Sequence, residues 1–295
     1  MGIVGEKDLE AVSFLFRGKA GHWFADHLMH LFSFDRVNRL YDNSSRFTGA
    51  EFAGSILRDL GVKYEIGNAE RLKQLPDGAF ITVSNHPYGG LDGVIMIDFM
   101  AGLRPDYRFM VNRILSMVKA MDENFISVTP TGNRKKEVTA ATINGIRETI
   151  RHLNEGHPVG FFPSGAVSDL SLREMRIRDR DWQPGIIHLI RSAKVPVLPV
   201  RFFDGNSPFF YSLGLINWRI RIMRQPSELF NKAGKRHRLG IGNIISVEEQ
   251  ERFADSLSLG QHLRKAVYEM PLPGSFILKE SLEYSELINK LKSEM

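Results

Sequence analysis

The strongest constraint on the fold is a change of pattern at Val62, after which short β-branched or aromatic runs alternate with helical patterns. This alternation is typical of parallel strands joined by helical crossovers. We therefore predict an α/β fold with a mostly parallel mixed sheet flanked by helices. The predicted strands are Lys63–Ile66, Ala79–Val83, Tyr107–Val111, Phe125–Val128, Val159–Phe162, Val195–Val200, Arg219–Met223 and Arg238–Ile241, and the predicted helices are Asp92–Gly102, Glu137–Asn154 and Gln183–Lys194.

The regions on either side of this alternating part have helical patterns. Apolar side chains recur at near-helical spacing in the first 60 residues, and Gly61 is placed to end a helix. After Gly242 the chain returns to a helical pattern that includes a final Leu282–Leu291 segment. We predict an N-terminal helical segment over residues 1–61, an α/β domain over 62–245 and a helical C-terminal tail over 246–295.

Composition excludes several kinds of chemistry. The chain has no Cys, which removes a thiol nucleophile, disulfides and thiolate metal sites. The net charge of +5 fits a solvated surface, an anionic membrane or an acidic carrier better than nucleic acid, because no basic run contains interleaved aromatic residues. No stretch reaches the ~18–20 apolar residues that span a bilayer, and the N-terminus lacks the pattern of a signal peptide. We expect a protein that is cytoplasmic or peripheral to a membrane, and no metal site.

Residues 81–93 combine a buried-looking strand with polar groups at its end. His86 follows the strand, and the carboxyl end of a strand is where α/β proteins bind ligands. Asp92 opens an apolar helix and can serve simply as its cap. Alternatively, it can hydrogen-bond one imidazole nitrogen of His86, which leaves the other nitrogen to accept a proton from an attacking hydroxyl. The second interpretation predicts a catalytic dyad.

Three further strands end in, or contain, residues of interest. The turn after Val159–Phe162 can offer backbone N–H groups, for instance at Gly165, to a developing oxyanion, although an ordinary loop fits as well. Ser164 in that turn lacks the preceding glycine of a nucleophile elbow, so we do not expect it to be a nucleophile. Arg134 follows another strand and can bind a phosphate or carboxylate. Pro199 indicates that its strand lies near an edge or a bulge.

Four sequence blocks, taken in chain order, resemble those of the glycerolipid acyltransferase superfamily, which includes the lysophosphatidate acyltransferases. The family's N-H-x-x-x-x-D block is similar to Asn85-His86 with Asp92, and its block with a substrate-binding Arg is similar to residues 127–134. Its F-P-E-G-T-R-S block is similar to residues 162–168, and its V-P-x-x-P-V strand to residues 195–200. The resemblance spans roughly residues 81–200. It implies the family's α/β fold, an acyl thioester donor and peripheral association with the inner membrane.

The chain departs from the family pattern in two places. Five residues instead of four separate His86 from Asp92, and the pair Gly89-Gly90 can form a bulge that absorbs the extra residue. The family's Glu and Arg of the third block, which are associated with the glycerol-phosphate head, are Ser164 and Val167 here. We therefore expect a different acceptor. The pattern is more similar to the bacterial subgroup often labelled hemolysin-like, some members of which O-acylate lyso-ornithine or lyso-glycine lipids.

The resemblance implies a mechanism that uses no cofactor. His86, oriented by Asp92, would take the proton of the acceptor hydroxyl, which attacks the thioester of acyl carrier protein or CoA. No acyl-enzyme is needed. Arg134 is the expected partner of the acceptor carboxylate. The residues expected to bind substrate are Asn85, Arg134, Pro163, Ser164 and Gly165.

A lipid acceptor also implies contact with a membrane surface at the inner face of the cell membrane. The first 61 residues and the arginine-rich turn Leu172–Arg180 are candidates for this contact, although a solvated loop fits the turn equally well. The aromatic segments Phe202–Phe203 and Phe209–Tyr211 are candidates for an acyl channel or for the core. Three other functions stay open: a lysophosphatidate or other lysophospholipid acyltransferase, a thioesterase, and a non-catalytic lipid-binding, hemolysin-like protein. We expect no nucleic-acid partner.

Overall fold

Eight strands form one mixed sheet at the centre of the computed structural model, which describes residues 33–129 and 140–282. The strands are β1 (Lys63–Gly67), β2 (Ile81–Ser84), β3 (Arg108–Asn112), β4 (Phe125–Val128), β5 (Val159–Phe161), β8 (Val197–Phe202), β9 (Arg236–Ile241) and β10 (Phe276–Leu278). Their order across the sheet is β10-β1-β9-β8-β2-β5-β3-β4. Neighbouring strands run parallel except in the pairs β1–β10 and β8–β9. The predicted mostly parallel mixed sheet is confirmed.

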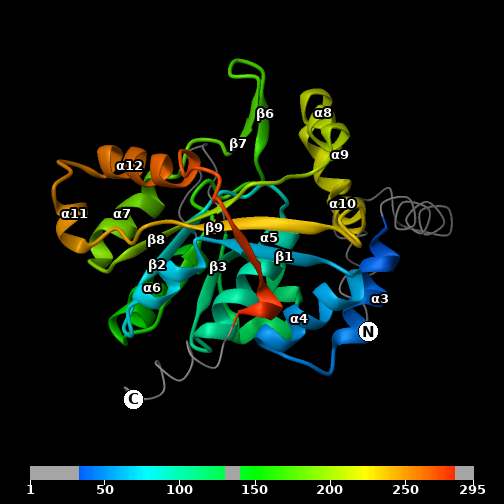
Figure 1. Cartoon of the computed structure of the whole chain (residues 1–295), viewed down its shortest axis with the longest axis horizontal. Helices are drawn as coiled ribbons and strands as arrows, with labels where there is room; N and C mark the ends of the chain where they lie inside the picture. The colour runs from blue at the N-terminus through cyan, green and yellow to red at the C-terminus, as the bar shows by residue number, and fades with distance from the viewer. Residues whose placement is uncertain (1–32, 130–139, 283–295) are drawn as a thin grey trace.

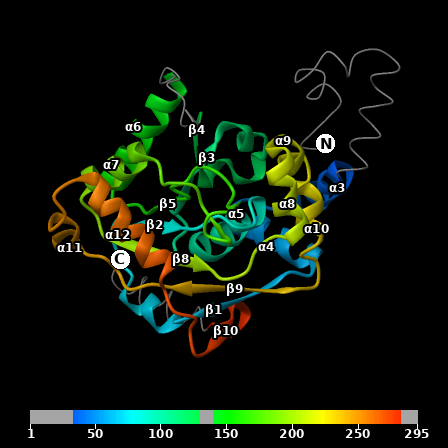
Figure 2. The same ribbon diagram turned by 90° about the horizontal axis from the view of Figure 1, so that it is seen from above.

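Helices cover both faces of this sheet (Figure 1). One face carries α3 (Phe34–Ser44), α4 (Gly49–Leu60) and α5 (Gly90–Met96), which continues into a π-helical turn at Ile97–Ala101. The other face carries α6 (Ala140–Asn154), α7 (Pro184–Ala193) and α12 (Ser256–Tyr268), as the view from above shows (Figure 2). The remaining helices are α8 (Pro208–Ile216), α9 (Trp218–Met223), α10 (Gln225–Phe230) and α11 (Val247–Glu251), and short 3-10 turns occur at Ala69–Gln74, Arg113–Met117, Lys119–Asn124 and Lys279–Ser281.

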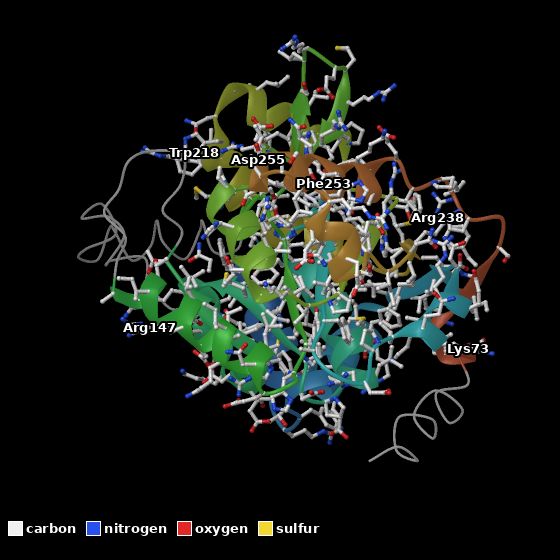
Figure 3. All side chains as sticks on the ribbon, turned by 90° about the vertical axis from the view of Figure 1, so that its left-hand side faces the viewer. Lys73, Arg147, Trp218, Arg238, Phe253 and Asp255 are labelled. Atoms are coloured by element: carbon white, nitrogen blue, oxygen red, sulfur yellow. The ribbon has the colours of Figure 1, made fainter. Side chains whose placement is uncertain are left out.

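The core consists of two apolar clusters, one on each face of the sheet. Strand β8 shows how the sequence divides its side chains between them, because successive residues of a strand point to opposite faces. Leu198 and Val200 belong to the cluster under α4 and α5, whereas Val197 belongs to the cluster under α7 and α12. Side chains fill the space between the layers (Figure 3). Strands buried on both faces explain the nearly continuous apolar runs in the sequence.

A two-stranded hairpin, β6 (Asp169–Ser171) and β7 (Arg176–Arg178), stands apart from the main sheet. It projects from the same end of the molecule as α8 and α9, beside which it lies (Figure 1).

The strand predicted at Arg219–Met223 is wrong, since these residues form α9. Arg and Ile alternate there with the period of a strand. The side chain of Asn217 nevertheless accepts a hydrogen bond from the Arg219 N–H at 2.8 Å, which caps a helix. Arg221 then points inward and pairs with Asp169. A local cap and a distant ion pair therefore override the local alternation.

Pro199 lies in an interior strand next to a bulge. Val200 pairs with Ile241, whereas Val197 pairs with Ile245, so one extra residue lies on the β9 side. The Pro199 carbonyl accepts a hydrogen bond from the Gly242 N–H at 2.8 Å, which shows that the proline nitrogen faces this bulge. Of the two predicted alternatives, the bulge is confirmed and the sheet edge is wrong.

The chain on either side of the α/β part is helical only in part. The predicted helical tail is wrong at Phe276–Leu278, which forms β10 and extends the main sheet by pairing with β1. Helix α4 ends at Leu60 with Gly61 at a φ of 64°, the left-handed conformation that favours glycine. Most of the predicted final helix, Leu282–Leu291, lies outside the described residues.

Candidate active site

His86 lies at the carboxyl end of β2, in the short loop that leads to α5. Strand β2 is central, with β8 on one side and β5 on the other. The loop after β5 contacts it, since the Ser168 N–H donates a hydrogen bond to the His86 carbonyl at 2.9 Å. The His86 ring stacks on Phe162 with ring centres 3.9 Å apart. The imidazole is therefore held from two neighbouring strand ends, as expected for a ligand site of an α/β sheet.

Asp92 lies against the His86 ring despite the extra residue between them. The Nδ1 atom of His86 is 2.8 Å from Oδ2 of Asp92. Gly89 makes this approach possible because its φ of 85° is open mainly to glycine. A side chain at Gly89 would also clash with the Gln225 side-chain amide. The predicted glycine bulge thus brings the two side chains together.

Asp92 makes the contacts that both interpretations require, those of a helix cap and those of a partner of His86. Oδ2 of Asp92 accepts hydrogen bonds from the Tyr88 and Gly89 N–H groups, each at 2.9 Å, so the carboxylate caps the first turn of α5. Its side chain is fully buried, and burial raises the pKa of Asp92, while the contact with His86 and the two N–H donors oppose that rise. The carboxylate is thus fixed in orientation by backbone groups and directed at the imidazole.

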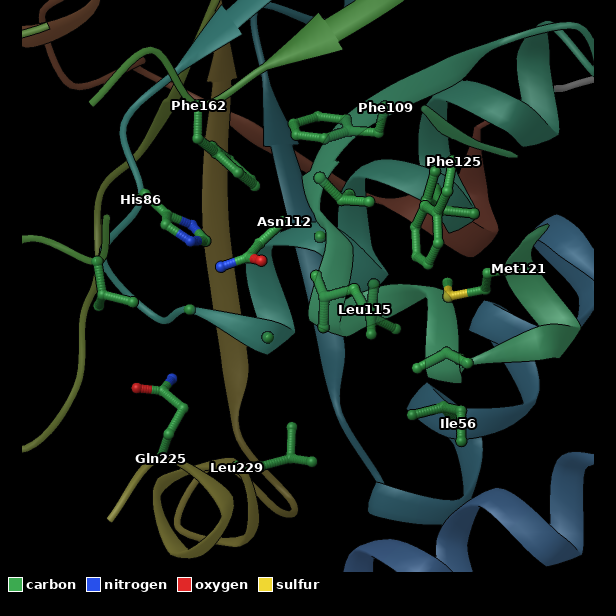
Figure 4. A pocket seen from close by; sticks show the side chains of 18 of the residues that line it. Ile56, His86, Phe109, Asn112, Leu115, Met121, Phe125, Phe162, Gln225 and Leu229 are labelled. Atoms are coloured by element: carbon green, nitrogen blue, oxygen red, sulfur yellow. The ribbon is translucent and has the colours of Figure 1, made fainter. Parts of the chain in front are cut away.

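An apolar cavity of about 370 Å³ extends from the imidazole into the protein. His86 lies at one end of it, and Ile56, Met121 and Phe125 lie at the opposite end (Figure 4). Gly90 and Gly165, both exposed, line the cavity near His86, so the cavity is open to the surface at the histidine end; Asn112 and Leu115 are further exposed lining residues. The polar side chains in the lining are those of His86, Asn112 and Gln225, together with the Tyr41 hydroxyl. A deep apolar cavity that ends at one titratable group suits a long hydrocarbon chain with a reactive head.

Two of the residues expected to bind substrate are engaged with the protein itself. The Asn85 side chain donates to the Phe202 carbonyl at 2.9 Å and accepts from the Phe202 N–H at 2.8 Å, so it ties the end of β2 to β8. The Ser164 hydroxyl donates to the Ala166 carbonyl at 2.8 Å within its own turn. Both side chains are buried. In the described structure both side chains stabilise the loops of the site, and their hydrogen-bonding groups are engaged there and not directed at a substrate.

The turn around Gly165 also differs from expectation. The Gly165 N–H, our candidate oxyanion donor, donates to the Phe162 carbonyl at 2.9 Å and is therefore used within the turn. The Gly165 backbone has a φ of 64°, and an added Cβ would clash with the Gln183 side-chain amide. The carbonyl of the buried Pro163 accepts from the Gln183 N–H at 2.9 Å. Glycine is thus required for packing of the turn, and Pro163 fixes the turn to the start of α7.

Two other expectations concern the acyl channel and the acceptor head. The aromatic residues that line the cavity are Tyr41, Phe52, Phe109, Phe125 and Phe162. The segments Phe202–Phe203 and Phe209–Tyr211 do not contribute to the lining, so the channel prediction for them is wrong. Arg134 lies outside the described residues.

Sequence reasoning missed Asp179, which supports the main chain of His86. Its Oδ1 atom accepts hydrogen bonds from the His86 N–H at 3.1 Å and from the Ser168 hydroxyl at 2.6 Å. The Asp179 N–H donates to the Tyr268 hydroxyl at 2.7 Å, and burial raises the pKa of Asp179. No local signal could have identified it, because it lies 93 residues from His86 in an arginine-rich segment.

Neither a metal site nor a membrane span is found among residues 33–129 and 140–282. No group of three or more His, Asp or Glu side chains in that part of the chain is arranged to hold a metal ion. No helix there is long and apolar enough to cross a membrane.

Comparison with known proteins gives matches of three kinds: a family, curated relatives and a solved structure. The sequence profile of a family described as acyltransferase matches residues 13–282. The chain is 25% identical over 244 residues to a lyso-glycine lipid O-acyltransferase of Bacteroides thetaiotaomicron, covering 80% of this chain and 85% of that protein. A protein of the same description from Phocaeicola vulgatus is 25% identical over 252 residues, covering 83% and 86%. The crystal structure of a 1-acyl-sn-glycerophosphate acyltransferase from Thermotoga maritima aligns with a TM-score of 0.46 at 15% identity, covering 74% of this chain and 79% of that one.

Proposed function

This chain belongs to the acyltransferase family, and from that premise we propose that it moves a fatty acyl group from a thioester to the hydroxyl of a lyso-aminolipid. The observation that carries the proposal is the His86–Asp92 pair at the open end of an apolar cavity. A dyad without such a cavity would suit many hydrolases and transferases. A cavity without the dyad would suit a lipid carrier.

The geometry supports general-base catalysis by His86. With Nδ1 directed at the carboxylate of Asp92, the Nε2 atom is the nitrogen left to accept a proton. The acceptor hydroxyl loses its proton to Nε2 as its oxygen bonds to the thioester carbonyl carbon. The tetrahedral intermediate then collapses, the carbon–sulfur bond breaks, and the proton on His86 passes to the departing thiolate. A positioned base of this kind contributes about 10²–10⁴-fold to the rate.

The cavity supports the acyl chain as the group that is held during transfer. Its walls come from α3, α4, α5, β3 and the 3-10 turns before β4, and its polar groups are few. The acyl chain would lie between Phe109 and Phe125 with its carbonyl carbon next to His86. Burying the chain there supplies binding energy at roughly 25 cal/mol per Å² of apolar surface.

The acceptor is the part of the proposal that rests on relatives and on two positions in this chain. The two curated relatives are described as acyltransferases of lyso-glycine lipids. Val167, which replaces the family's arginine, lines the cavity and brings no charge to it. Ser164, which replaces the family's glutamate, is bonded within its turn. These features favour a lyso-glycine or lyso-ornithine lipid over a glycerol phosphate.

The donor and the place of action are also proposals. We assign the donor to acyl carrier protein or CoA thioesters because acylation of a hydroxyl requires an activated acyl group. We assign the enzyme to the inner face of the cell membrane as a peripheral protein because its acceptor is a membrane lipid. No cofactor takes part in the proposed steps.

A direct test presents the purified protein with acyl carrier protein thioester or acyl-CoA and with lyso-glycine lipid, lyso-ornithine lipid or lysophosphatidate as acceptor. Diacylated aminolipid is the expected product. Phosphatidate as the main product would overturn the acceptor assignment and leave the dyad mechanism standing. Free fatty acid formed equally well without acceptor would identify a thioesterase. The absence of turnover with every acceptor and with both thioester donors would contradict the enzymatic proposal and favour a lipid-binding protein.

A further inference from the structure

Exposed apolar side chains are concentrated beside the open end of the cavity. Nine of the fifteen large apolar residues that are exposed in the described chain lie in residues 172–177 and 209–222. The most exposed are Met175 at the tip of the β6–β7 hairpin and Ile216 at the end of α8, at 75% and 78%. We call the outward faces of residues 172–180 and 209–224 the hairpin–helix surface. Both segments rise from the same end of the molecule (Figure 1).

Helix α9 buries one of its two arginines, Arg221, and exposes its large apolar side chains. Arg221 is only 3% exposed, donates to the Ser168 carbonyl at 3.2 Å and pairs with Asp169 at the start of β6. Trp218, Ile220 and Ile222 are turned outward. In Figure 3, Trp218 lies at the periphery of the molecule. A surface helix normally places such residues inward and its arginines outward. The exposure of these three apolar side chains on one short helix is what a face in contact with an apolar medium requires.

The same surface carries positive charge with few opposing acids. Arg173 and Arg176 are exposed on the hairpin, and Arg219 is exposed on α9. Glu174 is an exposed acid on the hairpin and pairs with Arg178 at 2.6 Å, whereas residues 205–226 contain no Asp or Glu. Arginines interleaved with Trp and aliphatic side chains match the interface of a bilayer, where the aliphatic groups enter the acyl region and the arginines meet anionic head groups. An acidic carrier protein would match the arginines but would leave the aliphatic groups exposed to water.

The hairpin–helix surface is continuous with the wall of the cavity. Val167 lines the cavity and lies two residues before β6. Gln225 also lines the cavity and is the first residue of α10, which follows α9 after Arg224. Arg180 shares a shallow surface hollow with Trp218 and Arg219, so the hairpin and α9 form one face. A lipid bilayer against this face would lie next to the open, histidine end of the cavity.

We propose that the hairpin–helix surface docks the enzyme on an anionic bilayer and presents the cavity to lipids in that bilayer. The role of the surface in delivering the acceptor rests on the proposed function. Docking itself does not, because it requires only the exposed side chains.

The test measures cosedimentation of the full chain with phosphatidylcholine vesicles that contain or lack phosphatidylglycerol, without donor or acceptor. Two double variants are compared with wild type: Ile216→Ser with Trp218→Ser, and Arg173→Glu with Arg176→Glu. Leu272→Ser is the matched control, because Leu272 is 58% exposed in the loop between α12 and β10. Acyl transfer to an acceptor dispersed in detergent and thermal unfolding show whether each variant is folded.

We expect wild type to prefer the anionic vesicles and each double variant to bind them about tenfold more weakly or worse. The Leu272 control should bind like wild type, and all variants should keep their activity in detergent. Unchanged vesicle binding in both double variants, or an equal loss in the control, would overturn the proposal. A raised KM for acyl carrier protein thioester in the arginine variant, with vesicle binding unchanged, would overturn it in favour of protein docking. A protein that binds vesicles through these residues but transfers no acyl group would count against the proposed function alone.

Discussion

The fully buried carboxylate of Asp92 lies 2.8 Å from Nδ1 of His86, and the same carboxylate oxygen accepts the Tyr88 and Gly89 N–H groups. One oxygen therefore caps a helix, fixes a loop and orients an imidazole. This shared use means that the local fold and the catalytic geometry cannot vary independently.

Replacing Asp92 with Asn should reduce acyl transfer by about 10²–10⁴-fold, because the amide still accepts the backbone N–H bonds but no longer stabilises a charged His86. The raised pKa of Asp92 also predicts the direction in which stability changes with pH. Above its ordinary value of 3.8, the native state holds a proton that the unfolded state has lost, so wild type loses stability relative to Asp92→Asn as pH rises through the native pKa. Urea unfolding of wild type and Asp92→Asn at a series of pH values from 3.8 upward measures the difference between their free energies of unfolding. A difference that is constant with pH would contradict the assigned direction.

Gly89→Ala should destabilise the protein by at least about 1–2 kcal/mol, because its φ is 85° and the added Cβ meets Gln225 and Val167. Gly90→Ala is the matched control, since a Cβ there meets nothing within 4 Å and the residue starts α5. Turnover should fall with the first substitution and persist with the second. Equal effects of the two substitutions on stability and turnover would refute the role given to Gly89 in closing the dyad.

The sequence indicated most of the central sheet and the pairing of His86 with Asp92, because both depend on local patterns. Strands buried on both faces read as short apolar runs, and a glycine pair signals a bulge. Features that depend on distant partners were not predictable. Helix α9 follows from the burial of Arg221 against Asp169, and the support of His86 comes from Asp179, far along the chain. The hydrogen bond from the Gly165 N–H to the Phe162 carbonyl depends on a turn geometry that the local sequence does not specify.

Substitutions at Gly93 should change the cavity without touching the dyad. Gly93 lies in α5 and lines the cavity, and a Cβ there meets nothing within 4 Å. Gly93→Ala should raise the free energy of unfolding by roughly 0.5–1 kcal/mol, because alanine favours a helix. Gly93→Leu should place a larger side chain in the cavity and shift the preference toward shorter acyl chains. Competition between thioesters of different lengths measures this shift, and an unchanged length profile in Gly93→Leu would show that the acyl chain binds elsewhere.

His237 should make the protein less stable in mild acid. It is buried against Tyr88, with Nδ1 3.1 Å from the Tyr88 hydroxyl, and burial lowers the pKa of His237 from 6.5 to about 4. The charge of Lys232 acts in the same direction and that of Asp204 opposes it. Between these values the unfolded state binds the extra proton, so stability is present above pH 6.5 and falls as pH drops toward 4.

The loss from His237 amounts to about 2 kcal/mol between roughly pH 7.5 and pH 5. His237→Gln should reduce this pH dependence by that amount, whereas His188→Gln, at an exposed position on α7, should leave it unchanged. Urea denaturation at the two pH values supplies the comparison. Identical pH dependence in wild type and His237→Gln would show that His237 does not titrate as assigned.

The most direct test of the central claim compares wild type, His86→Gln and His188→Gln in transfer from acyl carrier protein thioester to lyso-glycine lipid. All three should share the same thermal unfolding transition to within a few degrees, about the shift expected from a change of 1 kcal/mol. Transfer by His86→Gln should fall by about 10²–10⁴-fold, with His188→Gln equal to wild type. Transfer by a folded His86→Gln protein at the wild-type rate would contradict general-base catalysis by His86.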